Sequence, residues 1–154
     1  YELRRPYLWR FWTKLNSSGE ITIFDRTWYG RVLVERIEGY AHPIQWKRAY
    51  DEINRFEREL CDNQTVLIKF WLAISKEEQA LRFQSRQQTP HKRFKITKDD
   101  WRNRNRWDEY LSAAADMLER TNTDYAPWHV IATDDKYTAR IEMLHAILKQ
   151  LKAV

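Results

Sequence analysis

The chain has 154 residues, enough for one domain with a hydrophobic core, and 43% of them are hydrophobic, which excludes a disordered chain. No apolar run reaches the roughly 18 residues of a membrane span, so we expect no membrane partner. The formal net charge of +5 favours a polyanionic partner, and the single cysteine, Cys61, excludes an internal disulfide and suits a cytoplasmic location.

Hydrophobic periodicity predicts helices and strands that alternate along the chain. An apolar stripe predicts a helix over 8–15, and the apolar run at 20–24 predicts a short buried strand. There follow a helix from Pro43 to Leu60, a strand at 65–72, a helix at 76–88, a segment of little periodicity at 89–104, a helix at 107–118, a strand at 128–132 and a helix at 136–152. This order predicts an α/β fold, with a parallel sheet flanked by helices.

The positive charge is concentrated in one segment. Residues 75–107 contain ten Lys or Arg and four Asp or Glu, so this segment carries +6 and the rest of the chain about −1. A weakly amphipathic, basic insert beside a strand end is typical of a lid that closes over a charged substrate. Two alternatives remain open, an ordinary solvated basic helix and a surface for single-stranded nucleic acid, with Phe94, Trp101 and Trp107 available for stacking.

The first predicted strand ends in an acid followed by a base, Asp25-Arg26. Ligands of open parallel sheets bind beyond the carboxyl ends of the strands, and a carboxylate there suits Mg²⁺. Arg26 and Arg31 flank Asp25 and could grip phosphate oxygens. An acid at this place disfavours nucleic acid unless a metal is bound. The alternative is that Asp25 caps a helix that begins near Thr27.

Six stretches, in order over nearly the whole chain, resemble the second family of polyphosphate kinases. They are YLWRFW (7–12), IFDRTWYGRVLVERIEGY (23–40), SKEEQALRF (75–83), HKRFK (91–95), RWDEY (106–110) and APWHVIATDDK (126–136). The resemblance implies a P-loop nucleotide-kinase-like fold with a basic helical lid at about 75–107. It also implies magnesium-dependent phosphotransfer between inorganic polyphosphate and a nucleoside mono- or diphosphate. The residues from Gly30 to Arg36 are most similar to the branch that converts AMP to ADP.

The resemblance also implies roles for individual residues. Asp25 would bind the metal and, with Arg26 and Arg31, act on the transferred phosphate. The substrate-binding residues would be Glu35, Arg36, Arg82, Arg86, Lys92, Arg93, Asp135 and Lys136. For Asp134-Asp135, a helix N-cap is an equally good interpretation. We also expect a homo-oligomer.

The chain lacks the Gly-rich phosphate loop of such enzymes. Its three glycines, Gly19, Gly30 and Gly39, do not form a G-x-x-x-x-G-K motif. We therefore expect residues 1–154 to be part of a polyphosphate kinase domain, inactive alone, with a neighbouring strand or a bare sheet edge beside residues 21–24. A non-catalytic scaffold domain is a further alternative.

Overall fold

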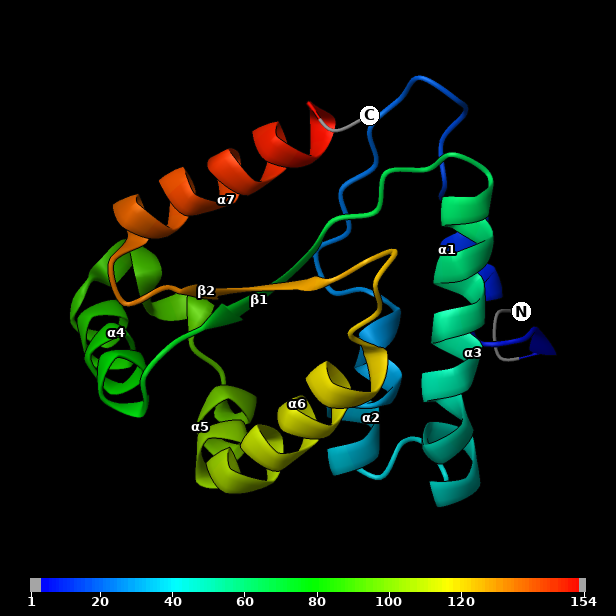
Figure 1. Cartoon of the computed structure of the whole chain (residues 1–154). Coiled ribbons are helices and arrows are strands. Elements are labelled where there is room, and N and C mark those ends of the chain that lie inside the picture. Colours follow the sequence, from blue (N-terminus) through cyan, green and yellow to red (C-terminus); the bar gives the residue numbers. More distant parts are fainter. Residues whose placement is uncertain (1–3, 153–154) are drawn as a thin grey trace.

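The computed structural model describes residues 4–152 and shows a mixed α/β fold. Strands β1 (Lys69–Ala73) and β2 (Trp128–Ala132) form a parallel two-stranded sheet in which Lys69 pairs with Trp128 and Ala73 with Ala132. In Figure 1 the sheet lies in the middle of the molecule, with α7 on one side and α5 and α6 on the other. The predicted fold class is confirmed.

Seven α-helices and two 3₁₀-helices are assigned in residues 4–152. They are α1 (Trp9–Trp12), η2 (Trp28–Arg31), α2 (Val34–Ile37), α3 (Pro43–Asp62), α4 (Lys76–Gln88), η3 (Pro90–Lys95), α5 (Lys98–Asn105), α6 (Trp107–Thr121) and α7 (Lys136–Leu151). No helix among these residues is both long enough and apolar enough to cross a membrane.

Local capping signals explain where the longer helices begin. Pro43 occupies the first turn of α3, and His42 and Gln45 form a capping box there. The Ser75 side chain accepts a hydrogen bond from the Glu78 amide at the start of α4, so this helix begins as predicted. The unassigned stretch at 89–104 contains a helix that the hydrophobic pattern missed, because α5 is polar and is started by the Thr97–Asp100 capping box.

The prediction of a strand at residues 20–24 was wrong. This segment is irregular, and Ile21 and Ile23 are 79% and 88% exposed. A strand exists only where a neighbour accepts and donates its backbone hydrogen bonds. Within residues 4–152, β1 and β2 pair only with each other, and no strand lies beside 20–24.

Element boundaries also differ from those predicted, most of all for β1 and α1. Strand β1 begins at Lys69 rather than at residue 65, because its only partner strand in the described chain is five residues long. Helix α1 ends at Trp12, because the amides of Lys14 and Leu15 bond three residues back and tighten the chain into turns.

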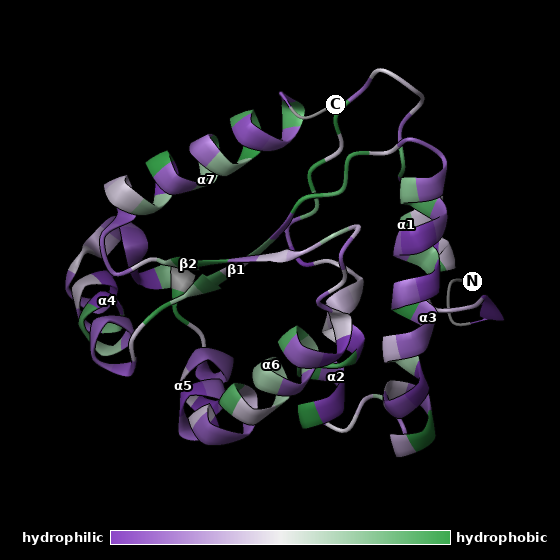
Figure 2. Cartoon of the chain, in the orientation of Figure 1, coloured by the Kyte–Doolittle hydropathy of each residue, from purple (hydrophilic) through white to green (hydrophobic). Residues whose placement is uncertain are grey.

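The hydrophobic core lies between η2, α3 and α6. Its buried members include Trp28, Tyr29, Ile53, Phe56 and Met117. Figure 2 shows apolar strands and helices that are striped with polar residues, while α4 and α5 are mostly hydrophilic. Two core residues, Trp28 and Tyr29, thus follow closely after Asp25-Arg26 in the chain, and the hydrophilic α4 follows the carboxyl end of β1.

Candidate functional site

Asp25 and Arg26 lie in an exposed bend just before η2. Arg26 adopts φ 68°, a left-handed backbone conformation that costs a non-glycine residue about 1–2 kcal/mol. Thr27, not Asp25, is the N-cap of η2, since its side chain accepts a hydrogen bond from the Tyr29 amide at 3.3 Å. No hydrogen bond or ion pair joins the Asp25 carboxylate to another residue within 4–152. The bend therefore presents Asp25 with its oxygens available.

Arg31 is held in a partly buried cluster. Its guanidinium pairs with Glu35 at 3.0 Å, and Arg10 pairs with the other oxygen of Glu35 at 3.2 Å. Both guanidinium groups lie over the ring of Tyr7, at 3.9 Å for Arg31 and 4.3 Å for Arg10. Burial and the nearby Glu35 carboxylate raise the pKa of Tyr7 to about 12, so Tyr7 is neutral. Glu35 thus orients Arg31.

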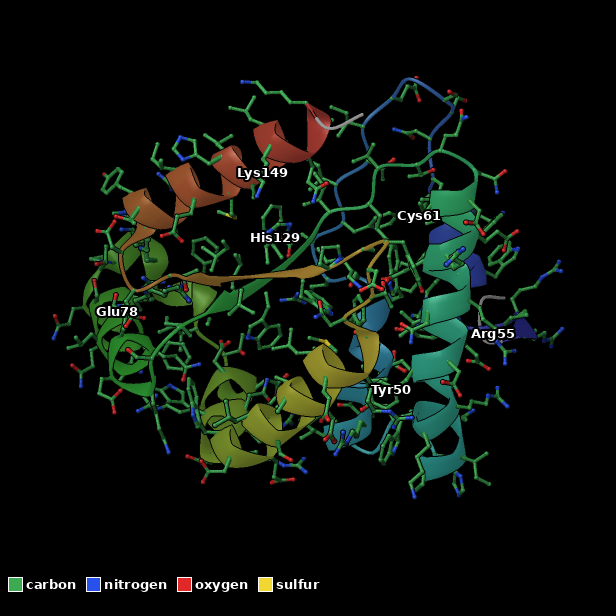
Figure 3. The ribbon with its side chains drawn as sticks, viewed as in Figure 1. Tyr50, Arg55, Cys61, Glu78, His129 and Lys149 are labelled. Atoms are coloured by element: carbon green, nitrogen blue, oxygen red, sulfur yellow. The ribbon has the colours of Figure 1, made fainter. Side chains whose placement is uncertain are left out.

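Arg36 points to a different place. It contacts the Asp116 carboxylate at 2.6 Å and the Tyr50 hydroxyl at 3.0 Å, and it lies 4.4 Å from the centre of the Trp46 ring. Tyr50 is labelled between α3 and α6 in Figure 3. Arg36 and Trp46 line a pocket of about 500 Å³ together with Ile37, Arg106, Asp108, Glu109 and Ser112. The Arg36 guanidinium is thus already engaged within the chain.

Four predicted cations meet in a second pocket, of about 430 Å³. Arg82, Arg86, Lys92 and Lys136 line it, together with Glu78, Leu81 and Ser85. They come from α4, η3 and the start of α7, and Figure 3 labels Glu78 on α4. Four cations against one carboxylate make this pocket suited to an anion with several negative charges.

The cations of this pocket differ in how they are held. Arg82 pairs with Glu78 at 2.8 Å and donates to the backbone carbonyls of Thr133 and Asp134 at 2.5 and 2.9 Å. The side chains of Arg86 and Lys92 form no hydrogen bond or ion pair with any described residue. Arg82 therefore joins α4 to the end of β2, while Arg86 and Lys92 are available to a ligand.

Two of the predicted ligand-binding residues have local partners. Arg93 donates from Nε to the carbonyl of Gln87 at 2.8 Å, and it does not line the pocket. Asp135 accepts a hydrogen bond from the Thr138 amide at 2.6 Å, which makes it the N-cap of α7 and lowers its pKa. The helix-cap interpretation of Asp135 is the one that the structure supports.

The polar strand ends converge, as the sequence predicted for β1 and β2. The Asp134 carboxylate accepts a hydrogen bond from the Ser75 amide at 2.9 Å, which joins the residue before α4 to the loop that follows β2. Hydrogen bonds from Ser75 lower the pKa of Asp134. This link fixes α4 and the start of α7 against each other, so that their cations line one pocket.

Sequence reasoning missed a buried charged pair, Glu57 and Lys69. Both lie in the core, with side chains 0% and 3% exposed and 2.8 Å apart. Trp28 and Tyr29 pack in the core, and both donate hydrogen bonds to Glu57. The signal was present in the sequence: Lys69 interrupts an apolar run that predicts a buried strand, and a buried lysine requires an acidic partner.

The carboxylate of Asp25 could serve as a ligand of Mg²⁺, although it does not belong to a cluster of metal-binding side chains within residues 4–152. No three His, Cys, Asp or Glu side chains gather into a metal cluster in the part of the chain that the structure describes. Mg²⁺ keeps several waters and often takes only one or two carboxylates, its other ligands coming from substrate phosphates. Asp25 is exposed and has no ion-pair partner in the described part of the chain, so it meets that smaller requirement.

Comparison with known proteins identifies the group to which this geometry belongs. The chain is 71% identical over 153 residues to a polyphosphate:AMP phosphotransferase of Acinetobacter johnsonii, and 51% identical over 152 residues to one of Pseudomonas aeruginosa. Each match covers 99% of this chain and about a third of the relative, 32% and 31% respectively.

A solved structure and a family model agree with these matches. The crystal structure of polyphosphate kinase 2 from Arthrobacter aurescens superposes with a TM-score of 0.94 at 36% identity, covering 99% of this chain and 54% of that one. The family model described as polyphosphate kinase 2 matches residues 1–154. A match over every residue shows the family, and the chain belongs to the polyphosphate kinase 2 family.

Proposed function

We propose that this chain is part of an enzyme that transfers phosphate from inorganic polyphosphate to AMP with the help of Mg²⁺. The observation that carries the proposal is the pocket in which Arg82, Arg86, Lys92 and Lys136 meet. Two relatives named polyphosphate:AMP phosphotransferases support the choice of substrates. In this proposal the cationic pocket and the Asp25 bend serve one active site.

The cationic pocket would bind the polyphosphate chain. Arg86 and Lys92, whose side chains have no hydrogen-bond or ion-pair partner among the described residues, supply charge, whereas Arg82 holds α4 in place and adds charge to the wall. Arginine contacts phosphate oxygens through a planar fork, and lysine contacts them as a point charge. Binding would therefore be mainly electrostatic, with little dependence on the identity of the substrate beyond its charge.

The Asp25 bend would act at the transferred phosphate. Asp25 would hold Mg²⁺, which when bound would neutralise charge on the phosphate oxygens. Arg26 and Arg31 would stabilise the negative charge that develops during transfer. The Glu35 carboxylate orients the Arg31 guanidinium for this role, so Glu35 would act through Arg31.

The acceptor nucleotide would be placed by residues on η2 and α2. Arg36 is anchored by Asp116 and Tyr50, so it would reach a nucleotide only through a change of partner. Its pocket contains an indole ring and three carboxylate- or guanidinium-bearing neighbours, Arg106, Asp108 and Glu109. This is a weaker match to a phosphate than the cationic pocket.

Residues 75–107 would form the lid of this partial kinase domain. The far end of the segment is tied to α2, because Glu38 pairs with Arg102 at 3.0 Å and with Arg106 at 3.2 Å. The Glu38 side chain is only 7% exposed, whereas those of Arg102 and Arg106 are 49% and 31% exposed, so the carboxylate is sheltered while its partners reach the surface. The cations that face the pocket would move relative to this fixed base.

A full-length protein that carries these residues provides the test. We expect Asp25→Asn to lower ADP formation from AMP, polyphosphate and Mg²⁺ by about a hundredfold or more, because it removes charge at the transferred phosphate. Circular dichroism should stay unchanged. Asp124→Asn, a charge change of the same size at another exposed aspartate, is the matched control. Near-normal turnover in Asp25→Asn would refute the metal role.

A further inference from the structure

The Glu57–Lys69 pair is the centre of a buried hydrogen-bond network. The ammonium of Lys69 contacts the carboxylate of Glu57 at 2.8 Å, the carbonyl of Thr121 at 2.7 Å and the hydroxyl of Tyr29 at 3.2 Å. The other oxygen of Glu57 accepts from Trp28 Nε1 at 2.9 Å and from the Tyr29 hydroxyl at 2.5 Å. The network thus joins η2, α3, β1 and α6.

A buried ion pair is not the most stabilising way to fill a hydrophobic core. Removing two charged groups from water costs free energy, and the attraction between the two charges offsets that cost only in part. Well-packed apolar side chains of similar volume would avoid this cost. Burial lowers the pKa of Lys69 and, with the Glu57 charge, raises that of Tyr29, in keeping with this cost. A buried polar network does, however, specify one arrangement of its members, since each hydrogen bond has a direction.

The arrangement that the network specifies is that of η2. Trp28 and Tyr29 follow Asp25 and Arg26 closely in the chain, and both insert their side chains into the core at 3% and 4% exposure. The bend before them holds Arg26 at φ 68°, which an unconstrained arginine rarely adopts. Anchors on the carboxyl side of the bend are needed to keep that conformation.

We propose that Glu57 and Lys69 are positioning residues that hold the Asp25–Arg31 bend in its working geometry. The expected effect of the pair on turnover rests on the proposed function. Its expected effect on the backbone of the bend rests on the hydrogen-bond network alone. The pair is buried in the core, so it would act on the bend through Trp28 and Tyr29 rather than on a ligand directly. Its loss would therefore impair the chemical step more than the binding of either substrate.

The test compares three variants of a full-length protein that carries these residues. Glu57→Leu/Lys69→Met removes the network without leaving a lone buried charge. Tyr29→Phe keeps both charges and removes one anchor. Ile53→Val loosens the same core one helical turn from Glu57 and leaves the network intact. For each we would measure thermal unfolding, kcat and KM for both substrates, and hydrogen exchange of the hydrogen-bonded amides of Gly30, Val32 and Leu33.

We expect kcat to fall about tenfold or more in the double variant and about threefold in Tyr29→Phe, with both KM values within about twofold of normal. Amide exchange at Gly30, Val32 and Leu33 should speed up in the same order. Ile53→Val should lower the unfolding temperature but leave kcat and these exchange rates unchanged.

Two results would overturn the inference. One is normal kcat and normal exchange in the double variant, and the other is an equal loss of kcat in Ile53→Val at matched stability. If the double variant does not fold, normal kcat and normal amide exchange in Tyr29→Phe would overturn the inference instead. If the unmodified protein transfers no phosphate, the proposed function fails, while the exchange rates still decide whether the network holds the bend.

Discussion

Replacement of Arg82 by alanine separates structural from ligand-binding roles in the cationic pocket. The Arg82 side chain is 18% exposed and donates to the carbonyls of Thr133 and Asp134, so it joins α4 to the end of β2. A hydrogen bond from a charged donor contributes about 1.5–3 kcal/mol. The Asp134 carbonyl is exposed and is rehydrated in the variant, so only the bond to Thr133 is lost at nearly full value.

The expected cost of Arg82→Ala is therefore about 2 kcal/mol in the free energy that holds α4 against β2. This corresponds to roughly 30-fold faster amide exchange across residues 76–88, since 1.4 kcal/mol is a factor of ten. Hydrogen exchange of a full-length protein, followed by mass spectrometry of peptides from α4, measures it directly. Polyphosphate affinity should fall in the same variant, because a cation of the pocket wall is lost.

Arg86→Ala is the matched control, since Arg86 lies one helical turn further along α4 and lines the same pocket. Its side chain has no hydrogen-bond or ion-pair partner in residues 4–152. The free energy that holds α4 in place, measured by amide exchange, should therefore change by less than about 0.5 kcal/mol. Affinity for polyphosphate should still fall. Equal exchange rates for α4 in the two variants would refute the structural role of Arg82.

Three further predictions concern other residues. In Arg86→Ala/Lys92→Ala, the slope of log affinity for polyphosphate against log salt concentration should shrink by roughly 1–2, as expected when two ion contacts are lost; an unchanged slope in titrations at several ionic strengths would place the polyanion elsewhere. Burial raises the pKa of Cys61, so at neutral pH its thiol should react with a disulfide reagent more slowly than a cysteine peptide, and unfolding by urea should abolish the difference. The amide of Thr138 lowers the pKa of Asp135 in the folded state. The cap therefore stabilises the folded protein at pH values above the pKa of Asp135 in the unfolded chain, and this stabilisation is lost as the pH falls through the pKa of the folded state. Asp135→Ala should therefore unfold more readily than the unmodified protein at pH 7, and the two should converge at about pH 2 in thermal melts.

Much of the helical structure could be predicted from the sequence because helix signals are local. The cap at Ser75 and the polar run after it define α4, and Pro43 with His42 and Gln45 defines the start of α3. The bounds of β2 also agree with the apolar run at 128–132. For the two helix starts the deciding contacts lie within a few residues of the element itself, whereas β2 also needs its pairing with β1.

The candidate site was predictable in its parts and not in its assembly. Arg82 and Arg86, four residues apart, share one face of α4, which the helical repeat alone indicates. That Lys92 and Lys136 face the same pocket depends on how η3 and α7 pack against α4, and Arg93 faces away although it is adjacent in sequence. For Asp135, only the Thr138 amide distinguished a cap from a ligand.

The sequence by itself determined the longer helices α3, α4, α6 and α7, the parallel α/β class, the basic segment and the acid–base pair at Asp25-Arg26, although it missed α5. Tertiary structure alone decided that residues 20–24 form no strand, because a strand is stabilised by backbone hydrogen bonds to a neighbour that can lie anywhere in the chain. Tertiary structure also decided that Lys69, the lysine within the apolar run, is buried and paired with an acid. Glu57 lies 12 residues from Lys69, and the Thr121 carbonyl 52 residues away. Only folding brings these groups within hydrogen-bond distance, and only their contact makes a buried charge at that place tolerable.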